Sequence, residues 1–190
     1  TYLEEIDEEL EPIIPALLAG LEVSAGEAVK EKINGWVDGK KYLSRILWFY
    51  RFSPGIDIKA VKRAAAVALE AGDERAISHS VEVVVTRHKD LGGDLIESVL
   101  LPAIDWLEKH GHHNWHGPLI VHGKDSPFQH LTEQQAQRVL AHLVSRDTID
   151  TRLDYLLGAI GKAHPNALVD FLGNRVRRER ELKADRDALA

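Results

Sequence analysis

Histidine is concentrated in one short stretch of this 190-residue chain. The run HGHHNWH occupies residues 110–116, and a further histidine follows six residues later, within the sequence LIVHGKD. Imidazole nitrogen is the commonest protein ligand for zinc, and a tetrahedral site needs four ligands. The stretch could therefore supply a zinc centre or a metal-dependent hydrolase, with five candidate ligands: His110, His112, His113, His116 and His122.

The spacing of these histidines argues against a ready-made metal site. Glycines on both sides confine the cluster to a segment too short for a helix, so helical spacing cannot bring the rings together. Against the metallo-hydrolase pattern His-x-His-x-Asp-His, Asn114 stands in place of the acid and Trp115 in place of the last histidine. We favour a polar surface loop, and a zinc site, a catalytic site and a pH-sensitive contact stay open as alternatives.

A second group of chemistry-bearing residues is basic. Residues 40–63 contain seven Lys or Arg against one acid, Asp57, an excess of seven minus one, or six, in a chain whose net charge is −6. Spacing of i, i+4 places two pairs of these cations on shared helical faces. The sequence therefore predicts a basic face that could bind an anionic partner, formed by Lys41, Arg45, Arg51, Lys59, Lys62 and Arg63.

The aromatic run WFYRF, residues 48–52, lies inside this basic segment. Its rings could stack on nucleic-acid bases or fill a pocket of a partner protein. Four rings within five helical positions point in most directions around the helix axis, which is typical of a buried central helix. We favour a core helix with a solvated basic face, with a protein partner and nucleic acid as the alternatives. The acidic total charge disfavours nucleic acid.

The elements that position these residues are predicted to be helices. Apolar residues recur at intervals of three and four along most of the chain, and strand-like alternation is nearly absent. Capping residues predict where the helices begin. These predicted starts are Ser24 with Glu27, Asp57, Asp73, Asp94, Thr132 with Gln135, Asp147 and Pro165.

Two longer intervals, from Asp57 to Asp94 and from Thr132 to Pro165, are each expected to hold two helices. This spacing is typical of helical-hairpin repeats. The stretch EAGDERAISHSVEVVV, residues 70–85, resembles a HEAT or armadillo-type repeat, with Gly72 and Asp73 in the turn and Arg75 opening the second helix. The resemblance extends over residues 41–175 and departs from the pattern at a long insertion. It implies an all-α fold of antiparallel hairpins stacked as an α-solenoid, and it carries no active site.

A further resemblance concerns AHPNALVDFLGNRV, residues 163–176, which is similar to the helical-repeat tails of large bacterial multidomain proteins. It implies a sensing or scaffolding portion of a longer chain. We predict a single α-helical repeat domain over residues 1–190. Its expected parts are N-terminal helices at 1–39, helical repeats at 40–110, an inserted His-rich loop at 111–131, helical repeats at 132–176 and a charged C-terminal helix or tail at 177–190.

The charged segments near the two ends of the sequence differ in sign. Residues 4–11, EEIDEELE, hold six carboxylates and no cation, whereas residues 175–187 hold six cations and four anions. We interpret the acidic segment as the solvated face of an amphipathic helix, since acid–base catalysis needs a desolvated carboxylate. Either segment is a candidate contact for a neighbouring domain.

The residue composition excludes several kinds of functional site. The chain has no cysteine, so disulfides, zinc–thiolate clusters and cysteine nucleophiles are excluded. It also lacks a Gly-x-Ser-x-Gly nucleophile motif and a phosphate-binding loop. Its apolar runs are far shorter than the roughly 20 residues of a membrane helix. We therefore expect a cytoplasmic protein without a membrane partner.

Three functions follow as hypotheses. The leading one is a non-enzymatic protein-interaction, scaffold or sensor module without a cofactor, which binds a protein partner or other domains of a longer parent chain. The alternative is a nucleic-acid-binding solenoid, similar to the HEAT-like DNA glycosylases, that uses the basic face and its aromatic residues. The third is a hydrolase that holds zinc in the histidine loop.

Overall fold

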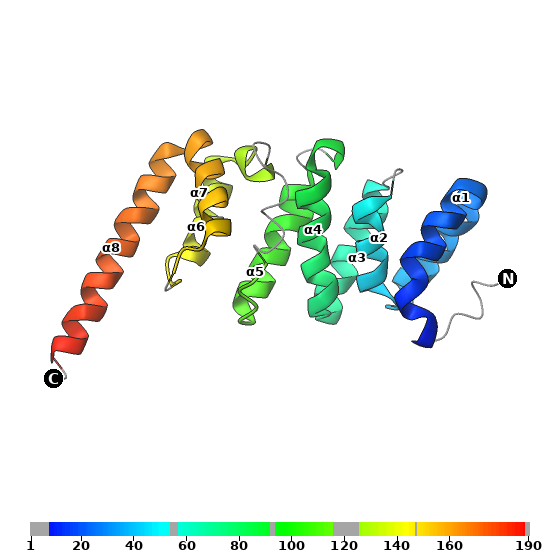
Figure 1. Cartoon of the computed structure of the whole chain (residues 1–190), viewed down its shortest axis with the longest axis horizontal. Coiled ribbons are helices and arrows are strands. Elements are labelled where there is room, and N and C mark those ends of the chain that lie inside the picture. The colour runs from blue at the N-terminus through cyan, green and yellow to red at the C-terminus, as the bar shows by residue number, and fades with distance from the viewer. Residues whose placement is uncertain (1–7, 54–56, 92–93, 116–125, 147, 189–190) are drawn as a thin grey trace. The chain divides into compact units, whose positions relative to one another are not determined.

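The computed structural model describes residues 8–53, 57–91, 94–115, 126–146 and 148–188 (Figure 1). Every regular element within these ranges is a helix and none is a strand, so the predicted all-α class is confirmed. The elements are the 3₁₀ helices η1 (Glu8–Ile13) and η4 (Pro127–Gln129), the π-helix η2 (Ile96–Leu100), and the α-helices α1 (Ile14–Asp38), α2 (Leu43–Phe52), α3 (Ile58–Ala71), α4 (Glu74–Leu91), α5 (Leu101–Lys109), α6 (Glu133–Leu143), α7 (Thr151–Ala163) and α8 (Pro165–Ala188).

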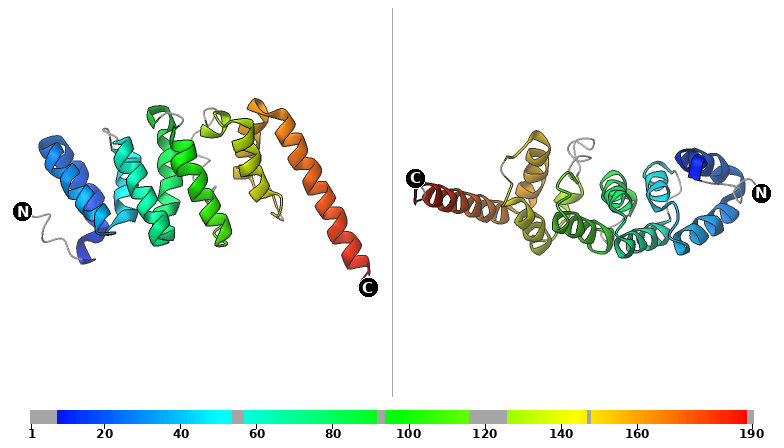
Figure 2. Two further views of the ribbon diagram at one scale, coloured as in Figure 1. Left: turned by 180° about the vertical axis from the view of Figure 1, so that it is seen from behind. Right: turned by 90° about the horizontal axis from the view of Figure 1, so that it is seen from below.

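The backbone divides into two compact units, Thr1–Trp115 and His116–Ala190. In the first unit α2 packs against α1, α3 and α4, and α4 also packs against α3 and α5 (Figure 2). In the second unit α8 packs against α6 and α7, and α7 contacts η4. That residues 1–190 form one domain stays a prediction.

The hairpin of α3 and α4 forms where the sequence predicts it. The carboxylate of Asp57 accepts hydrogen bonds from two backbone N–H groups of the first turn of α3, at 2.9 and 3.2 Å. Gly72 ends α3 with a φ of 67°, in the left-handed region that glycine adopts without steric cost. Asp73 then accepts from the N–H of Ala76 at 3.0 Å and so begins α4.

Helix starts in the second unit agree with the sequence in two of three cases. α6 begins with the predicted capping box, in which Thr132 Oγ1 accepts from the Gln135 N–H and Gln135 Oε1 accepts from the Thr132 N–H. α8 begins at Pro165, as predicted. The third predicted cap, Asp147, lies outside the described residues, and α7 is capped by Asp150.

The helix start predicted at Ser24 is wrong, because α1 continues without a break from Ile14 to Asp38. A capping box stabilises a helix start because the first N–H groups of a helix have no carbonyl partner. Inside α1 the carbonyls of the preceding turn already accept those bonds. The carboxylate of Asp94, another predicted start, pairs with Lys62 of α3.

The core of the first unit is built around α4. The consecutive residues Val83, Val84 and Val85 are all buried, so α4 has neighbours around most of its circumference. Full burial of one such side chain contributes about 1.5–3 kcal/mol to folding. Ala64 and Ala68 of α3 are also fully buried, and their small side chains let helices approach closely.

A π-helix leads into α5 and sets its direction. Pro102 is the second residue of α5, and proline has no N–H to give to the carbonyl one turn earlier. The wider turn of η2 precedes it, with the N–H of Leu101 donating to the carbonyl of Ile96. The histidine segment begins directly at the end of α5, with His110 as its C-cap.

The inserted segment is anchored by aromatic side chains in its described parts. Trp115 and Phe128 are 2% and 0% exposed. Residues 116–125 of the segment lie outside the described ranges. In the part of the chain that the structure describes, no helix has the length and hydropathy required to cross a bilayer.

Candidate functional site

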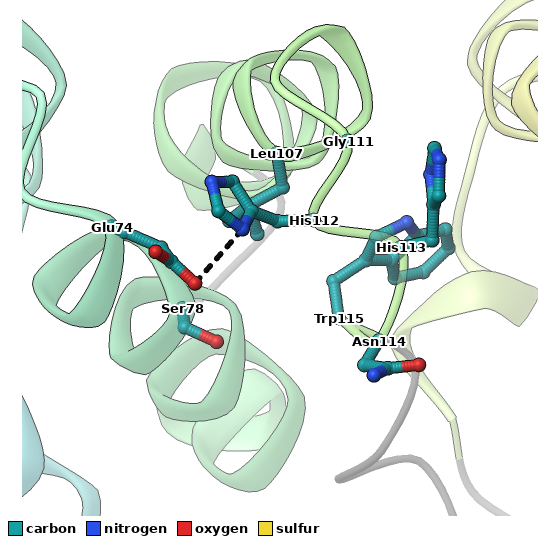
Figure 3. Close-up of a pocket in the computed structure, with 8 residues that line it drawn as sticks. All are labelled: Glu74, Ser78, Leu107, Gly111, His112, His113, Asn114 and Trp115. Atoms are coloured by element: carbon teal, nitrogen blue, oxygen red, sulfur yellow. Dashed lines mark ion pairs between the residues drawn. The ribbon is translucent and has the colours of Figure 1, made fainter.

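The histidine segment begins as a helix C-terminus. Gly111 has a φ of 80°, and the N–H of His112 donates to the carbonyl of Leu107 at 2.8 Å. This bond closes the end of α5 in the manner of a glycine-terminated helix, so the chain reverses direction at the glycine. The reversal places His112 and His113 on a short turn between α4 and α5 (Figure 3).

The two ion-paired histidines of the segment have different carboxylate partners, while the rings of His110 and His112 both stack on Trp106. His112 Nδ1 lies 2.9 Å from Glu74 Oε1, and His113 Nδ1 lies 2.8 Å from Glu108 Oε2. The ring of His110 stacks on Trp106, with 3.9 Å between ring centroids. Figure 3 shows the His112 and His113 rings pointing to different sides of the turn.

Zinc coordination requires ligand atoms that converge on one point. Among the described residues, no group of three or more His, Asp or Glu side chains could hold a metal ion. His110, His112 and His113 therefore do not form a metal centre with other described residues. His116 and His122 lie outside the described residues, so zinc binding through them stays a prediction.

Glu108 holds the turn against α5. Its carboxylate, only 7% exposed, accepts a hydrogen bond from Trp115 Nε1 at 2.5 Å while its other oxygen lies beside His113. A buried carboxylate costs free energy unless it is hydrogen-bonded, and these two contacts meet that need. The Glu108 contacts therefore explain the order of the turn without invoking catalysis.

A small pocket of about 200 Å³ opens beside the turn, and Ser78 of α4 lines it together with His112 and Glu74. A serine nucleophile needs a base within hydrogen-bond reach of its hydroxyl. In Figure 3 the His112 ring points toward Glu74 and not toward the Ser78 hydroxyl. The pair is also substantially exposed, at 36% and 58%, so water screens it. The arrangement provides an imidazole–carboxylate contact and no activated nucleophile.

The predicted basic face is largely compensated by acids in the structure. Five of the seven cations in residues 40–63 pair with carboxylates from other parts of the first unit. Lys41 and Lys59 are exposed. The five pairs are Lys40 with Glu70 at 3.1 Å, Arg45 with Glu11 at 3.2 Å, Arg51 with Glu82 at 2.6 Å, Lys62 with Asp94, and Arg63 with Asp38.

The Arg51–Glu82 pair is the most buried of these, with side chains 20% and 19% exposed. His79, one turn before Glu82 on α4, places its Nδ1 3.2 Å from the same carboxylate oxygen. Burial opposes ionisation of Glu82, but the hydrogen bond and charge of His79 and then those of Arg51 outweigh it, so the pKa of Glu82 is lowered. The three residues join α2 to α4 through one shared carboxylate.

The aromatic run on α2 divides between the core and the surface. Phe49 and Tyr50 are buried, which agrees with the predicted core helix. Trp48 and Phe52 are 39% and 58% exposed, in contrast to that prediction. Their rings meet edge to face, with 5.0 Å between centroids, and the guanidinium of Arg51 lies 5.1 Å from the Phe52 ring centroid.

The sequence contained a signal for this exposed pair. Trp48 and Phe52 are four positions apart, so they occupy one helical face together with Arg45. Hydrophobicity alone assigned all the rings to the core. Only the packing of α2 against α1, α3 and α4 determines which face stays open.

Comparison with models of known protein families, with curated proteins and with solved structures finds no match to this chain.

Proposed function

We propose that this chain is a non-enzymatic protein-interaction module of the HEAT/armadillo helical-repeat type, in which antiparallel hairpins stack as an α-solenoid. Support for the repeat architecture comes from the α3–α4 hairpin, joined by Gly72 and Asp73, and from the packing of α4 on α2, α3 and α5. Such scaffolds expose helix faces along a continuous core, and those faces bind partners.

One observation carries the proposal, namely the exposed pair of Trp48 and Phe52 on an otherwise buried helix. Large aromatic side chains are the most frequent anchors of protein interfaces, since each removes a large apolar area from water. The edge-to-face contact between the two rings limits their rotation before binding. A preordered anchor loses less conformational entropy when a partner covers it.

The charges around the pair indicate the kind of partner. Arg45 shares this helical face and is partly exposed while it pairs with Glu11, and Lys41, which precedes the helix, is exposed. A complementary protein surface would offer an apolar pocket for Trp48 with carboxylates at its rim. Nucleic acid fits less well, because five nearby cations already have carboxylate partners and binding to phosphates needs available cations.

The test compares the native chain with the double variant Trp48→Ala, Phe52→Ala. Captured proteins are identified after nuclease treatment, and each is then purified and titrated against both chains by calorimetry. The matched control is Tyr155→Ala, which removes a 53% exposed aromatic ring from α7. Circular dichroism checks that all three chains are folded.

We expect a purified partner that binds the native chain and the Tyr155→Ala variant equally, and that loses about 2 kcal/mol or more of binding free energy with the double variant. Equal binding to all three chains would refute a role for the α2 face. Retention of nucleic acid that nuclease removes, with a steep dependence on salt, would replace the protein partner by the nucleic-acid alternative.

A further inference from the structure

Helix α8 of the second unit has a buried face and an exposed apolar face. Ala167 and Phe171 are each 2% exposed and lie where α8 packs against α6 and α7. Val169, Leu172 and Val176 are 65%, 46% and 48% exposed. Because they are three and four positions apart, these three side chains form one row along the helix, the α8 stripe.

The helices that pack on α8 are much shorter than α8 itself. α8 has 24 residues, whereas α6 has 11 and α7 has 13 (Figure 1). Among the described residues, α8 carries four of the eight large apolar side chains that are exposed, namely the three of the stripe and Leu182. Single exposed apolar residues are common on protein surfaces, but a contiguous apolar row indicates a surface that binds another element.

Cations surround the C-terminal end of the stripe. Arg177, Arg180 and Lys183 are exposed, and no ion pair joins any of them to a described carboxylate. Arg177 donates to the side-chain amide oxygen of Asn174 at 2.5 Å, and this neutral partner leaves its charge uncompensated. Residues 176–183 hold four cations and two carboxylates, a balance of four minus two, or +2, in a chain whose net charge is −6. A partner of the stripe therefore gains from carboxylates beside its apolar residues.

The dimensions of the stripe fit a helix as its partner. Val169 and Val176 are seven residues apart, so the row is about 10 Å long and one side chain wide. An amphipathic helix presents apolar residues at the same intervals of three and four, and its row packs beside such a row. A lipid surface fits less well, because membrane-surface helices use a wide apolar face with aromatic residues, and Phe171, the one aromatic residue of α8, is buried.

We infer that the α8 stripe binds an acidic amphipathic helix of a partner protein. The apolar row of that helix packs on the three side chains of the stripe, and its carboxylates pair with Arg177, Arg180 and Lys183. The surface belongs to the second unit and goes beyond the proposed function, because it does not involve the aromatic pair of α2. The Trp48→Ala, Phe52→Ala variant should therefore bind such a helix as the native chain does, and either proposal can fail without the other.

The experiment selects binders from a displayed library of amphipathic helices of about 18 residues. Every member has the same row of leucines, and the positions beside the row vary among Glu, Lys, Gln and Ala. Peptides that the native full chain enriches are synthesised and titrated against it by calorimetry, up to about 1 mM, at low and high salt. The composition of the enriched peptides reports the charge of the partner that the stripe accepts.

Leu172→Ala tests the apolar row, and Leu182→Ala is its matched control. Both leucines belong to α8 and have similar exposure, 46% and 43%, but Leu182 lines a small pocket together with Val144 at the end of α6. The charge test is Arg180→Gln, with Arg178→Gln as its control, since Arg178 lines the same pocket. Circular dichroism checks that each variant is folded.

We expect enrichment of glutamate beside the leucine row and binding that weakens as salt is added. Leu172→Ala and Arg180→Gln should weaken the selected peptides about tenfold and about threefold, whereas both controls change binding less than about twofold. Enrichment of lysine, a selection that enriches no peptide, or equal effects of Leu172→Ala and Leu182→Ala would each overturn the inference. Sedimentation with vesicles of anionic lipid that Leu172→Ala abolishes, in the absence of peptide binding, would assign the stripe to a membrane instead.

Discussion

The basic residues of α2 and α3 differ from Arg175 of α8 in the groups that hold them. Arg51 of α2 meets Glu82 of α4, and Arg63 of α3 meets Asp38 of α1, so these cations are compensated within the first unit. Arg175 instead donates to backbone carbonyls of residues 143 and 146, at the end of α6. A run of cations in sequence is therefore a poor guide to a charged surface.

The comparison also separates two uses of arginine. In the first unit Arg51 connects helices through a carboxylate, with its Nη1 donating to Glu82 Oε2. In the second unit Arg175 connects helices through backbone carbonyls, which carry no net charge. Carbonyls bond Arg175 without neutralising its charge, and its neighbour Glu179, 3.9 Å from Arg175 Nη2, is 71% exposed to water.

The largest expected effect tests the compensated region. Replacing Glu82 by Ala leaves Arg51 partly buried without its carboxylate, which should lower the free energy of unfolding by about 2 kcal/mol. The matched control is Glu70→Ala, which removes an exposed partner of Lys40 and should cost less than about 0.5 kcal/mol. Urea unfolding followed by circular dichroism measures both, and equal losses would contradict the distinction.

A somewhat smaller effect on the free energy of unfolding is expected for Arg175, which bonds the end of α6. Arg175→Ala removes two hydrogen bonds to the end of α6 and should lower the stability of the second unit by about 1.5 kcal/mol. Arg178→Ala should cost less than about 0.5 kcal/mol, because Arg175 and not Arg178 donates to the carbonyls at the end of α6. Hydrogen exchange of the last turn of α6 distinguishes them, and equal protection in the two variants would show that the assignment is wrong.

The dependence of stability on pH sharpens the account of Glu82. Its pKa in the folded chain is lowered, so it stabilises the fold fully above its ordinary pKa of 4.5 and loses that contribution as pH falls through the lower folded value. Glu82→Gln cannot titrate and should show a shallower loss of stability below about pH 4.5. Thermal midpoints between about pH 3 and pH 7 test this, and parallel curves for both chains would exclude the contribution.

The smallest effect concerns the exposed pairs. The side chains of Arg63 and Asp38 are 48% and 56% exposed, so water screens their attraction. A double-mutant cycle with Arg63→Ala and Asp38→Ala should give a coupling free energy of about 0.5 kcal/mol that disappears at high salt. A coupling above about 2 kcal/mol would place this pair in the same class as Arg51 and Glu82.

Sequence patterns predicted the helices well where local interactions determine them. Asp57, Asp73 and Thr132 cap helices as expected, since a cap needs only a side-chain acceptor within three residues of free N–H groups. The same rule failed at Ser24, where the helix had already begun. A capping pattern does not reveal whether the preceding turn is helical.

The candidate sites were harder to predict, for a physical reason that the histidines illustrate. Five histidines close in sequence left a shared metal open as an alternative to a polar loop, and the structure shows that His112 meets Glu74, 38 residues earlier, and His113 meets Glu108. Side-chain direction on a turn depends on the neighbouring helices. Proximity in sequence therefore did not predict convergence of the rings.

The sequence by itself determined the all-α class, the α3–α4 hairpin and the starts of α3, α4, α6 and α8, because these depend on hydrogen bonds and apolar spacing within a few residues. Only the tertiary structure decided which charges are compensated and which rings of α2 remain exposed. Those outcomes depend on contacts such as Arg51 with Glu82, which lie 31 residues apart. Packing of whole helices brings such residues together. A pattern within a few neighbouring residues cannot indicate which distant residues will meet.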